Sequence, residues 1–370
     1  MDKVYDLTII GAGAAGLFNA ASYEGSCCIL EKNSEAAKKI YATGNGRCNY
    51  LNVEADSSCY NNPDFVEAVF EMVSPDDLYW EFTNIGVIGS EEENGRMYPR
   101  SNEAKTIARA LINAASNADI KYNFEVKSAK KEEDIFIVES TGGQIVRSLN
   151  LLIATGGKAG IQFGSDGRGL KIAQSFGHNI IKPIPALAPM TCSEDISSLA
   201  GVRVEAMINL IKHSENRDEI IAFEYFGEVQ FTKDAISGIC VMDLARNIKL
   251  EEGVKYTLTV NPFWDYEKSE LEDLLKDYPL ENLIPEKLAN YMKQGKNLSF
   301  TITGTKGWPD AQTTAGGVDV NEINVDTMES KLVPGLYFAG EVIDVDGYCG
   351  GFNLTWAFAS ALIAARSIND

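Results

Sequence analysis

The feature that most constrains the fold of this chain is a glycine-rich turn directly after an apolar segment near the N-terminus. Val4–Ile10 becomes wholly apolar toward its end and runs into the pattern Gly11-x-Gly13-x-x-Gly16. Glycines at this spacing permit a tight turn, let backbone N–H groups approach a pyrophosphate, and allow a helix to pack closely on a strand. The turn therefore predicts a buried parallel strand followed by a phosphate-binding loop.

The residues after this turn complete a βαβ unit. Residues 14–23 are predicted to form a helix, and residues 26–30 a short strand that ends at Glu31. The helix directs its positive end at the phosphates. A carboxylate at the end of the second strand accepts hydrogen bonds from the ribose hydroxyls of an adenosine, and it disfavours a 2′-phosphate. The unit is typical of dinucleotide binding; the alternative is an ordinary βα turn beside a surface glutamate.

A second glycine-rich region lies at the other end of the chain. Residues 335–341 form an apolar strand that ends at Gly340 and Glu341, and residues 350–353 open an apolar helix. The Glu341 carboxylate can accept a hydrogen bond from a ribitol hydroxyl, and a helix N-terminus places partial positive charge near flavin N1. Both ends together predict one long cofactor, FAD. The alternative for the helix is a buried C-terminal helix with a glycine cap.

Two further loops are predicted to contact this cofactor. Residues 43–49 alternate glycine with polar residues, which suits a loop whose backbone wraps a ligand. Arg47 would serve the pyrophosphate or lie beside the flavin, and Cys48 and Asn49 would reach the isoalloxazine edge. Residues 155–157 end a buried strand, where open α/β sheets place their ligand crevice. The alternative for residues 43–49 is a flexible glycine turn with a solvated arginine, and the alternative for residues 155–157 is a simple turn.

The predicted cofactor-binding residues come from all of these segments, with Lys32 and Val126 added. They are Gly11, Gly13, Ala14, Ala15, Gly16, Glu31, Lys32, Gly44, Gly46, Arg47, Cys48, Asn49, Val126, Thr155, Gly156, Gly157, Gly340, Glu341, Gly350, Gly351, Phe352 and Asn353.

The remaining chemically active side chains carry weaker signals. Lys38 and Lys39 are expected to be solvated, and His178 follows a glycine after a helix, which suggests a helix cap. His213 lies between strand-like segments and forms no catalytic motif with His178. Tyr348 is the side chain that we expect nearest the flavin. The sequence identifies no catalytic acid or base and no metal ligand.

Composition excludes some classes of function. The formal charge of −20 argues against a nucleic-acid surface, because such a surface needs clustered Lys and Arg. Seven cysteines include no C-x-x-C pair, which disfavours a disulfide scaffold, a zinc site or a paired-thiol redox centre. No apolar run is long enough to span a membrane, and Asp2 and Asp6 break the signal-peptide pattern. We therefore expect a cytoplasmic protein with a small-molecule substrate; its oligomeric state stays open.

The order of strand and helix patterns predicts a discontinuous domain. Prolines near residues 183–189 mark a boundary, since each blocks continuation of a helix or a ladder. We expect an α/β, Rossmann-type FAD-binding domain over 1–187, a β-rich domain with a small helical subdomain over 188–308, and a return to the FAD-binding domain over 309–370. The first part is expected to contain helices at 64–82 and 101–117 with a cap at Ser101-Asn102, a three-stranded meander at 121–127, 135–139 and 144–147, and a buried strand at 149–154.

With these motifs assembled, the chain resembles the bacterial aminoacetone-oxidase-like flavoproteins, a group that includes a flavoprotein implicated in bile-acid dehydroxylation. It is similar to glutathione-reductase-type and fumarate-reductase-type FAD enzymes. The resemblance implies bound FAD and a β-rich domain inserted in the FAD-binding domain. The chain departs from its relatives at Tyr348 and Cys349, where the relatives often have smaller residues. The resemblance is carried by residues 11–16, 43–49, 95–99, 185–189, 227–232 and 313–353.

The predicted function is that of a FAD-dependent oxidoreductase that moves a hydride between flavin N5 and a small organic substrate. No second glycine fingerprint lies within residues 186–305, so no domain is dedicated to NAD(P)H. Either an amine or aminoketone reduces the flavin and oxygen reoxidises it, or NAD(P)H docks transiently and drives reduction of an activated double bond. The alternative is a non-catalytic flavin-binding redox sensor or complex component. An RNA-modifying role is opposed by the acidic charge.

Overall fold

The computed structural model describes residues 3–214, 217–249 and 251–369. It divides the chain into two compact units, the first made of Met1–Ile184 with Thr313–Asp370 and the second of Pro185–Gln312. The boundaries expected from the sequence were 187/188 and 308/309. The chain passes from one unit to the other through β10 (Ile184–Ala186) and returns through β17 (Thr313–Ala315).

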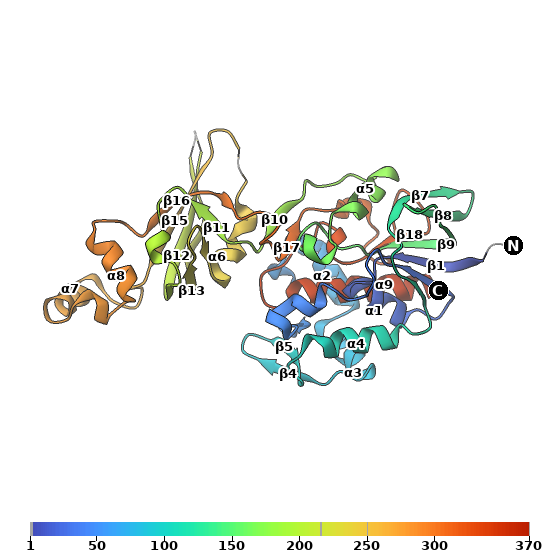
Figure 1. The fold of residues 1–370 in the computed structure, drawn as a ribbon, viewed down its shortest axis with the longest axis horizontal. Coiled ribbons are helices and arrows are strands. Elements are labelled where there is room, and N and C mark those ends of the chain that lie inside the picture. Colours follow the sequence, from blue (N-terminus) through green and yellow to red (C-terminus); the bar gives the residue numbers. More distant parts are fainter. Residues whose placement is uncertain (1–2, 215–216, 250, 370) are drawn as a thin grey trace. The chain divides into compact units, whose positions relative to one another are not determined.

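The first unit is built on a seven-stranded sheet with the order β6-β2-β1-β9-β8-β7, and β18 pairs with β9 (Figure 1). The central strands are apolar along nearly their whole length because both faces of a parallel sheet are covered. The strands are β1 (Val4–Ile10), β2 (Cys27–Leu30), β6 (Asp119–Lys121), β7 (Val126–Glu132), β8 (Ile135–Ser140), β9 (Ile145–Ile153) and β18 (Leu336–Phe338).

Strand β9 changes partner along its length, which the sequence did not predict. Its first half pairs antiparallel with β8, and its last residues pair parallel with β18, while β1 runs along its other side. The segments expected at 144–147 and 149–154 are therefore one strand. The strand expected at 121–127 is also wrong: β6 ends at Lys121, and Asn123, with φ of 56°, lies in the turn before β7 begins.

Six helices pack on this sheet and on one another (Figure 1). The helix expected at 64–82 is two helices, because Ser74 makes a capping box with Asp77 and Pro75 starts a new helix. The Ser101-Asn102 cap is also wrong, since Glu103 is the N-cap residue. The helices are α1 (Ala14–Ser22), α2 (Pro63–Met72), α3 (Pro75–Asn84), α4 (Ala104–Ala114), α5 (Arg168–Ser175) and α9 (Phe352–Asn369).

Helix α9 is the centre of the helical layer. Its residues 355–365 are all buried, so it presents an apolar surface on every side. The ring of Phe358 lies 5.0 Å from that of Phe18 in α1 and 4.8 Å from that of Phe82 in α3, measured between centroids. Within the described part of the chain, no helix is long and apolar enough to cross a membrane.

Shorter elements complete the first unit and the connections. A three-stranded antiparallel sheet, β3-β5-β4, consists of Leu51–Asn52, Arg96–Pro99 and Gly89–Glu92. Among the described residues, the 3₁₀ helices are η1 (Ile40–Gly46), η2 (Ser57–Cys59), η3 (Ile161–Phe163), η4 (Ser197–Leu199), η5 (Ala245–Asn247), η6 (Leu280–Asn282), η7 (Val320–Glu322) and η8 (Gly340–Val342).

The second unit is a closed barrel with the strand order β11-β14-β13-β12-β15-β16. Alternate residues of β12, such as Ala206, Ile208 and Leu210, point into a core separate from that of the first unit. The expected β-rich domain with a helical piece is confirmed, although its closure into a barrel was not predicted. Its elements are β11 (Met190–Cys192), β12 (Arg203–His213), β13 (Asp218–Phe231), β14 (Ile236–Ser237), β15 (Lys255–Asn261), β16 (Ser299–Thr305), α6 (Ile239–Leu244), α7 (Lys268–Asp277) and α8 (Glu286–Lys293).

His178 closes helix α5 and is built into the first unit as a neutral ring. Its backbone N–H donates to Ala173, as a helix cap should. Nδ1 lies 2.9 Å from Glu322 and Nε2 lies 2.8 Å from the Ser330 hydroxyl. That hydroxyl accepts two backbone N–H groups, so it donates to Nε2 and cannot accept a proton from it. Burial lowers the pKa of His178 below its ordinary value of 6.5, although Glu322 opposes the shift.

This arrangement predicts a loss of stability in mild acid. The folded protein binds fewer protons than the unfolded chain when the histidine pKa is lowered, so the stabilisation is present above about pH 6.5 and falls as the pH drops below it. Urea unfolding between pH 5 and pH 7.5 should show this decline. In His178→Gln the decline should be smaller, whereas His213→Gln, on an exposed side chain paired with Asp218, should retain it.

Candidate functional site

The three glycines of the first turn have three different physical roles. Gly11 has φ of +109°, and a Cβ there would lie 2.6 Å from the carbonyl oxygen of Ala154. A Cβ at Gly16 would lie 2.0 Å from the carbonyl oxygen of Gly11, so only glycine lets α1 pack this closely. Gly13 differs from both: its φ of −89° suits any residue, and a Cβ there would meet no protein atom within 4 Å. Nothing within the protein requires a glycine at this position.

The open space beside Gly13 fits a bound pyrophosphate. Gly13 is the N-cap residue of α1 and has no side-chain hydrogen bond, so the first N–H groups of the helix lack a capping side chain. A phosphate at a helix N-terminus satisfies those groups, and it needs the close backbone approach that a missing Cβ allows. The predicted loop therefore has the shape and the donors for the group.

Glu31 is buried and ties the phosphate loop to the end of β2. Its Oε2 accepts the N–H of Ala12 at 3.0 Å, and its Oε1 accepts the backbone and side-chain N–H groups of Asn33 at 2.8 and 2.7 Å. A carboxylate oxygen accepts about two hydrogen bonds, so Oε2 retains one acceptor position. That position can accept a ribose hydroxyl, while the other three hold the loop.

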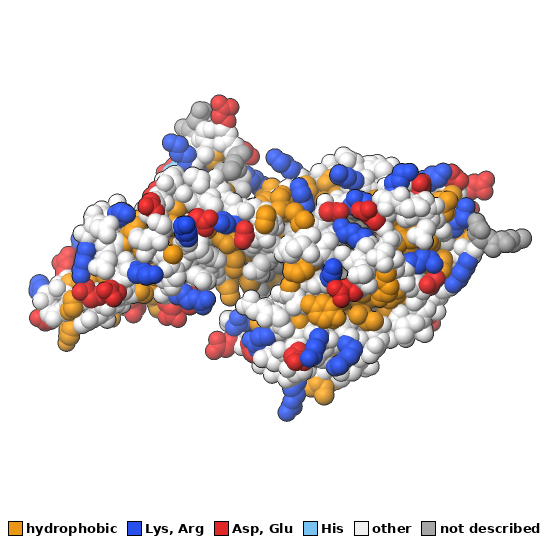
Figure 2. Space-filling view, viewed as in Figure 1, with side chains coloured by type: hydrophobic (Ala, Val, Ile, Leu, Met, Phe, Trp, Pro, Cys, Tyr) orange, Lys and Arg blue, Asp and Glu red, His pale blue; other side chains and the backbone are white. Residues whose placement is uncertain are grey.

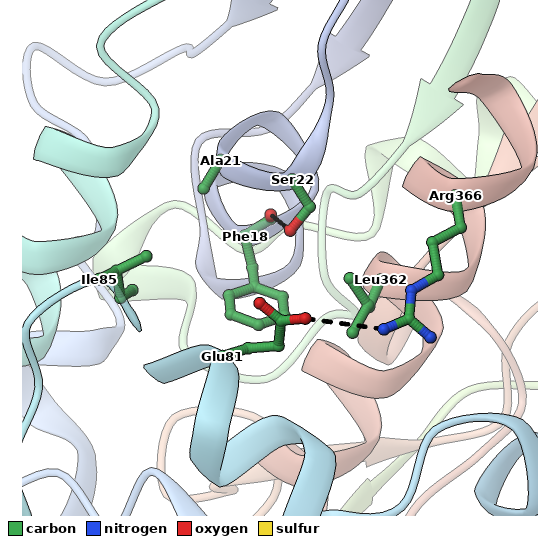
Figure 3. Close-up of a pocket in the computed structure, with 7 residues that line it drawn as sticks. All are labelled: Phe18, Ala21, Ser22, Glu81, Ile85, Leu362 and Arg366. Atoms are coloured by element: carbon green, nitrogen blue, oxygen red, sulfur yellow. Dashed lines mark hydrogen bonds and ion pairs between the residues drawn. The ribbon is translucent and has the colours of Figure 1, made fainter. Parts of the chain in front are cut away.

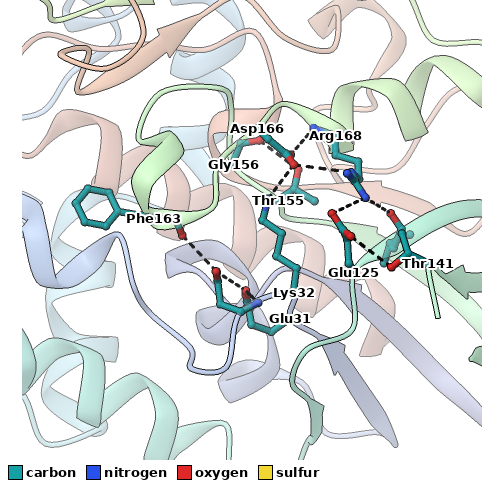
Figure 4. A network of polar contacts seen from close by, with 11 residues as sticks. Glu31, Lys32, Glu125, Thr141, Thr155, Gly156, Phe163, Asp166 and Arg168 are labelled. Atoms are coloured by element: carbon teal, nitrogen blue, oxygen red, sulfur yellow. Dashed lines mark hydrogen bonds and ion pairs between the residues drawn. The ribbon is translucent and has the colours of Figure 1, made fainter.

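A network of charged side chains continues from Glu31 (Figure 4). Lys32 pairs with Asp166 at 2.9 Å, and Arg168 pairs with Glu125 at 2.8 Å. Arg168 also donates to the carbonyl oxygen of Val126 at 3.3 Å. Arg168 also lies 3.8 Å from Asp166. The predicted residues Lys32 and Val126 thus lie in one network that joins the end of β2 and the start of β7 to the start of α5.

Glu341 joins segments that are far apart in the sequence. Its Oε1 accepts the N–H of Thr314 at 2.9 Å, and its Oε2 pairs with the ammonium of Lys39 at 2.7 Å. A Cβ at Gly157 would lie 3.1 Å from Oε1, so the end of β9 packs directly on this carboxylate. The predicted residues 155–157 and Glu341 are therefore neighbours.

Lys39 is a residue that sequence reasoning missed. Both Lys38 and Lys39 were expected to be solvated; both side chains are about one-third exposed, and Glu35 is 3.9 Å from the Lys38 ammonium. Lys39 instead reaches Glu341, some three hundred residues away. No local pattern distinguishes the two lysines, because the carboxylate that binds one of them comes from the other end of the chain.

The arginine of the loop at residues 43–49 is held by three other side chains of the first unit. The Arg47 guanidinium binds Glu92 and Asn102 and lies over the Tyr98 ring, 4.0 Å from its centroid. Its charge is thereby directed at β4, β5 and the residues before α4. The role of Arg47 beside the pyrophosphate or the flavin stays a prediction.

The end of the same loop meets the start of α9. A Cβ at Gly351 would lie 2.9 Å from Asn49 Oδ1, a buried oxygen with no hydrogen-bond partner. Cys48 is fully buried with φ of 60°, and burial raises the pKa of its thiol to about 12. The two predicted motifs are therefore brought together, and Asn49 offers an unused acceptor there. A flavin, whose N3–H is a donor, fits this site.

Asparagines hold the loop that precedes α9. Asn353 Oδ1 accepts the N–H of Gly347, and its amide donates to the carbonyl oxygens of Gly347 and Tyr348. Asn61 and Asn62 donate to Asp344 from the other side. Burial raises the pKa of Asp344, and these amides oppose the shift. The sequence identified Asn353 but missed Asn61 and Asn62, which lie outside any glycine motif.

A separate pocket of about 200 Å³ lies on the helical layer and contains none of the predicted cofactor residues. Its floor is apolar, and Glu81 and Arg366 form an ion pair at 3.6 Å beside it (Figure 3). Among the described residues, no group of three or more His, Cys, Asp and Glu side chains is placed to hold a metal ion. The pocket is lined by Phe18, Ala21, Ser22, Glu81, Ile85, Leu362 and Arg366.

Comparisons with known proteins identify the family of the chain. The model of the HI0933-like protein Rossmann domain matches residues 5–367. A 3-dehydro-bile acid delta(4,6)-reductase from Clostridium scindens is 30% identical over 97% of this chain and 98% of that protein. Ribosomal RNA dihydrouridine synthases are 29% identical in Escherichia coli, over 98% of this chain and 99% of that protein, and 30% identical in Haemophilus influenzae, over 100% of both.

Two solved structures share the fold. The open conformation of a flavocytochrome c3 fumarate reductase has a TM-score of 0.54 and 14% identity, covering 100% of this chain and 79% of that one. A 3-ketosteroid delta1-dehydrogenase from Sterolibacterium denitrificans has a TM-score of 0.52 and 11% identity, covering 99% of both. The fold and the site define an FAD-dependent oxidoreductase built on a Rossmann-type domain. The chain belongs to the HI0933-like family, and the predicted fold class and family resemblance are confirmed.

The geometry at Gly13 predicts that folding and cofactor binding can be separated. Gly13→Ala adds a methyl group that meets no protein atom, so the melting temperature of the flavin-free protein should hardly change. The methyl group would occupy the phosphate space, so the FAD dissociation constant should rise at least about tenfold. Gly16→Ala is the contrast, because its methyl group collides with Gly11 and should destabilise the fold itself. Equal FAD affinity in Gly13→Ala would contradict the assignment.

Glu31→Gln tests the carboxylate in a second way. Both carboxylate oxygens accept backbone N–H groups, so an amide placed there must turn its NH₂ toward one of those donors in either orientation. We expect unfolding to become easier by about 1–3 kcal/mol, and FAD to bind more weakly because the phosphate loop loses its anchor. Chemical denaturation and FAD titration measure the two effects, and Glu24→Gln, on an exposed side chain, is the control.

Proposed function

We propose that this oxidoreductase reduces a carbon–carbon double bond conjugated to a carbonyl group in a small organic molecule. The observation that carries the proposal is what the names of its full-length relatives have in common. One name describes the reduction of double bonds in a 3-oxo bile acid, and the other describes the formation of dihydrouridine. Both reactions add two hydrogens across a double bond that is conjugated to a carbonyl group.

The described residues suit such a reaction. When bound, FAD supplies two-electron hydride chemistry at N5. The N-terminus of α9, an 18-residue helix, presents partial positive charge, which stabilises negative charge developing nearby. Asn353 holds the loop at Gly347 and Tyr348 and so positions the side chain that we expect nearest the flavin.

The electron donor is proposed to be NADH or NADPH, bound transiently. A transient donor needs no dinucleotide-binding domain of its own, and residues 186–305 show no second glycine fingerprint. Oxidation of an amine or aminoketone with oxygen as the acceptor is the competing use of the same cofactor. The buried thiol of Cys48 does not take part in either scheme, because a thiol with so high a pKa stays protonated.

Charge favours a small substrate over RNA. The chain has a net charge of −20, whereas RNA binding requires clustered positive charge to neutralise phosphates. On the face shown in Figure 2, Lys and Arg side chains are interspersed with Asp and Glu and form no continuous basic area. Reduction of a uridine in ribosomal RNA is nevertheless the second candidate, because two relatives at 29% and 30% identity have that name.

Anaerobic stopped-flow mixing tests the proposal in two half-reactions. NADH or NADPH should bleach the flavin absorbance of the purified holoprotein. A 3-oxo-4-ene steroid should then restore it, and the matching saturated ketone, which lacks the conjugated double bond, should not. Bleaching follows from hydride transfer from the nicotinamide to the flavin, and reoxidation follows from hydride transfer from the flavin to a carbon of the conjugated double bond.

The other outcomes identify the alternatives. Bleaching by an aminoketone but by neither nicotinamide would contradict the reductase and favour the oxidase. No bleaching by any donor would favour a non-catalytic flavin-binding protein. If the reduced protein is reoxidised by a uridine-containing ribosomal RNA fragment and by no small enone, the RNA reaction replaces the small-molecule proposal.

A further inference from the structure

Lys39 occupies an unusual position for a lysine expected to be solvated. Its side chain is 31% exposed, and its ammonium lies 2.7 Å from Glu341 Oε2. The stem runs over Gly160, where a Cβ would lie 3.4 Å from Lys39 Cε. Contacts along the aliphatic part of the side chain and at the ammonium hold the ammonium in one place.

That place is the phosphate loop. The N–H of Ala37 donates to the carbonyl oxygen of Ala12 at 2.8 Å, so the chain just before Lys39 is fixed to the glycine-rich turn. Glu341, at the other end of the ion pair, directly follows Gly340, where a Cβ would lie 3.0 Å from the Ala15 Cβ in the first turn of α1. Both partners of the ion pair are thus anchored beside the helix N-terminus at Gly13.

The charges around this site require a cation. Glu31 and Glu341 place two carboxylates there, and the pyrophosphate of FAD would bring two more negative charges. Lys32 and Arg47, the basic residues that the sequence analysis assigned to the cofactor, are paired with Asp166 and Glu92. Lys39 has three N–H donors and uses one of them on Glu341.

We propose that Lys39 is the cation that binds the pyrophosphate of FAD, and that its ion pair with Glu341 holds it in position. The proposal rests on FAD as the cofactor but not on the identity of the substrate or the electron donor. The ammonium donates to a phosphate oxygen with an N–H that Glu341 does not use. Glu341 keeps about one acceptor position for a ribitol hydroxyl, because a carboxylate has about four and the Thr313 hydroxyl, the Thr314 N–H and Lys39 use three of them.

The test measures binding by the full-length protein after removal of its flavin. Titration with FAD and with riboflavin, which lacks the phosphates and the adenosine, separates a contact to that half of the cofactor from a contact to the isoalloxazine or the ribitol. In Lys39→Met the FAD dissociation constant should rise about tenfold or more, and this loss should shrink at high salt. Riboflavin should bind as it does to the wild type. Lys39→Arg, which keeps the charge, should retain most of the FAD affinity.

Lys38→Met is the matched control, because the neighbouring lysine carries the same charge without reaching the loop. It should bind FAD like the wild type. If Lys38→Met weakens FAD as much as Lys39→Met, the effect is general electrostatics and the proposal is overturned.

The same substitution in a Glu341→Gln variant tests the other explanation, in which Lys39 only neutralises the charge of Glu341. In Glu341→Gln there is no carboxylate to neutralise, so adding Lys39→Met should still weaken FAD several-fold if the lysine binds phosphate. Equal FAD affinity in Glu341→Gln and the double variant would overturn the proposal, as would an equal loss for riboflavin in Lys39→Met. Failure of the wild type to bind FAD would instead contradict the cofactor assignment itself.

Discussion

The site depends on one close contact, in which Gly340 brings the two ends of the chain together. Gly340 has φ of +75°, its N–H donates to Ser360 Oγ and its carbonyl oxygen accepts the indole N–H of Trp356. Its missing Cβ leaves room for Ala15. Gly340 therefore lies against Ala15 in α1 and bonds to Ser360 in α9, and the two helices pack on each other. A Cβ at Gly340 would also lie 3.5 Å from the Ala357 Cβ, so the first turn of α1 and the N-terminal half of α9 meet at this glycine.

Features set by local chemistry could be predicted from the sequence. The glycine spacing identified the turn before α1, and the residue after an apolar strand identified Glu31 and Glu341, since each depends on a few adjacent residues. Interactions between distant segments could not be predicted. Nothing near Lys39 indicates a carboxylate at position 341, and nothing in β9 shows that its two halves pair with different strands. Pro75 is typical of the first position of a helix, but residues 64–82 were predicted as one helix.

In the inserted unit, too, strands could be predicted from the local sequence, but the pairing of those strands could not. A β-rich domain was predicted over residues 188–308, and β12 and β15 show the alternation of buried and less buried residues that is typical of strands. Closure into a barrel depends on which strands become neighbours, and a period of two does not specify this. Because the barrel has its own buried core, its surface can change in evolution without disturbing the packing that supports the cofactor residues.

The burial of Cys48 affects how the protein tolerates oxygen. Reduced flavins react with oxygen to give peroxide, and peroxide attacks thiolates far faster than protonated thiols. Cys48 lies beside Asn49 at the candidate flavin site, where peroxide would be formed, yet it is fully buried with a pKa of about 12. The thiol is therefore both sheltered and protonated at neutral pH. Both properties disfavour oxidation of Cys48 to a sulfenic acid.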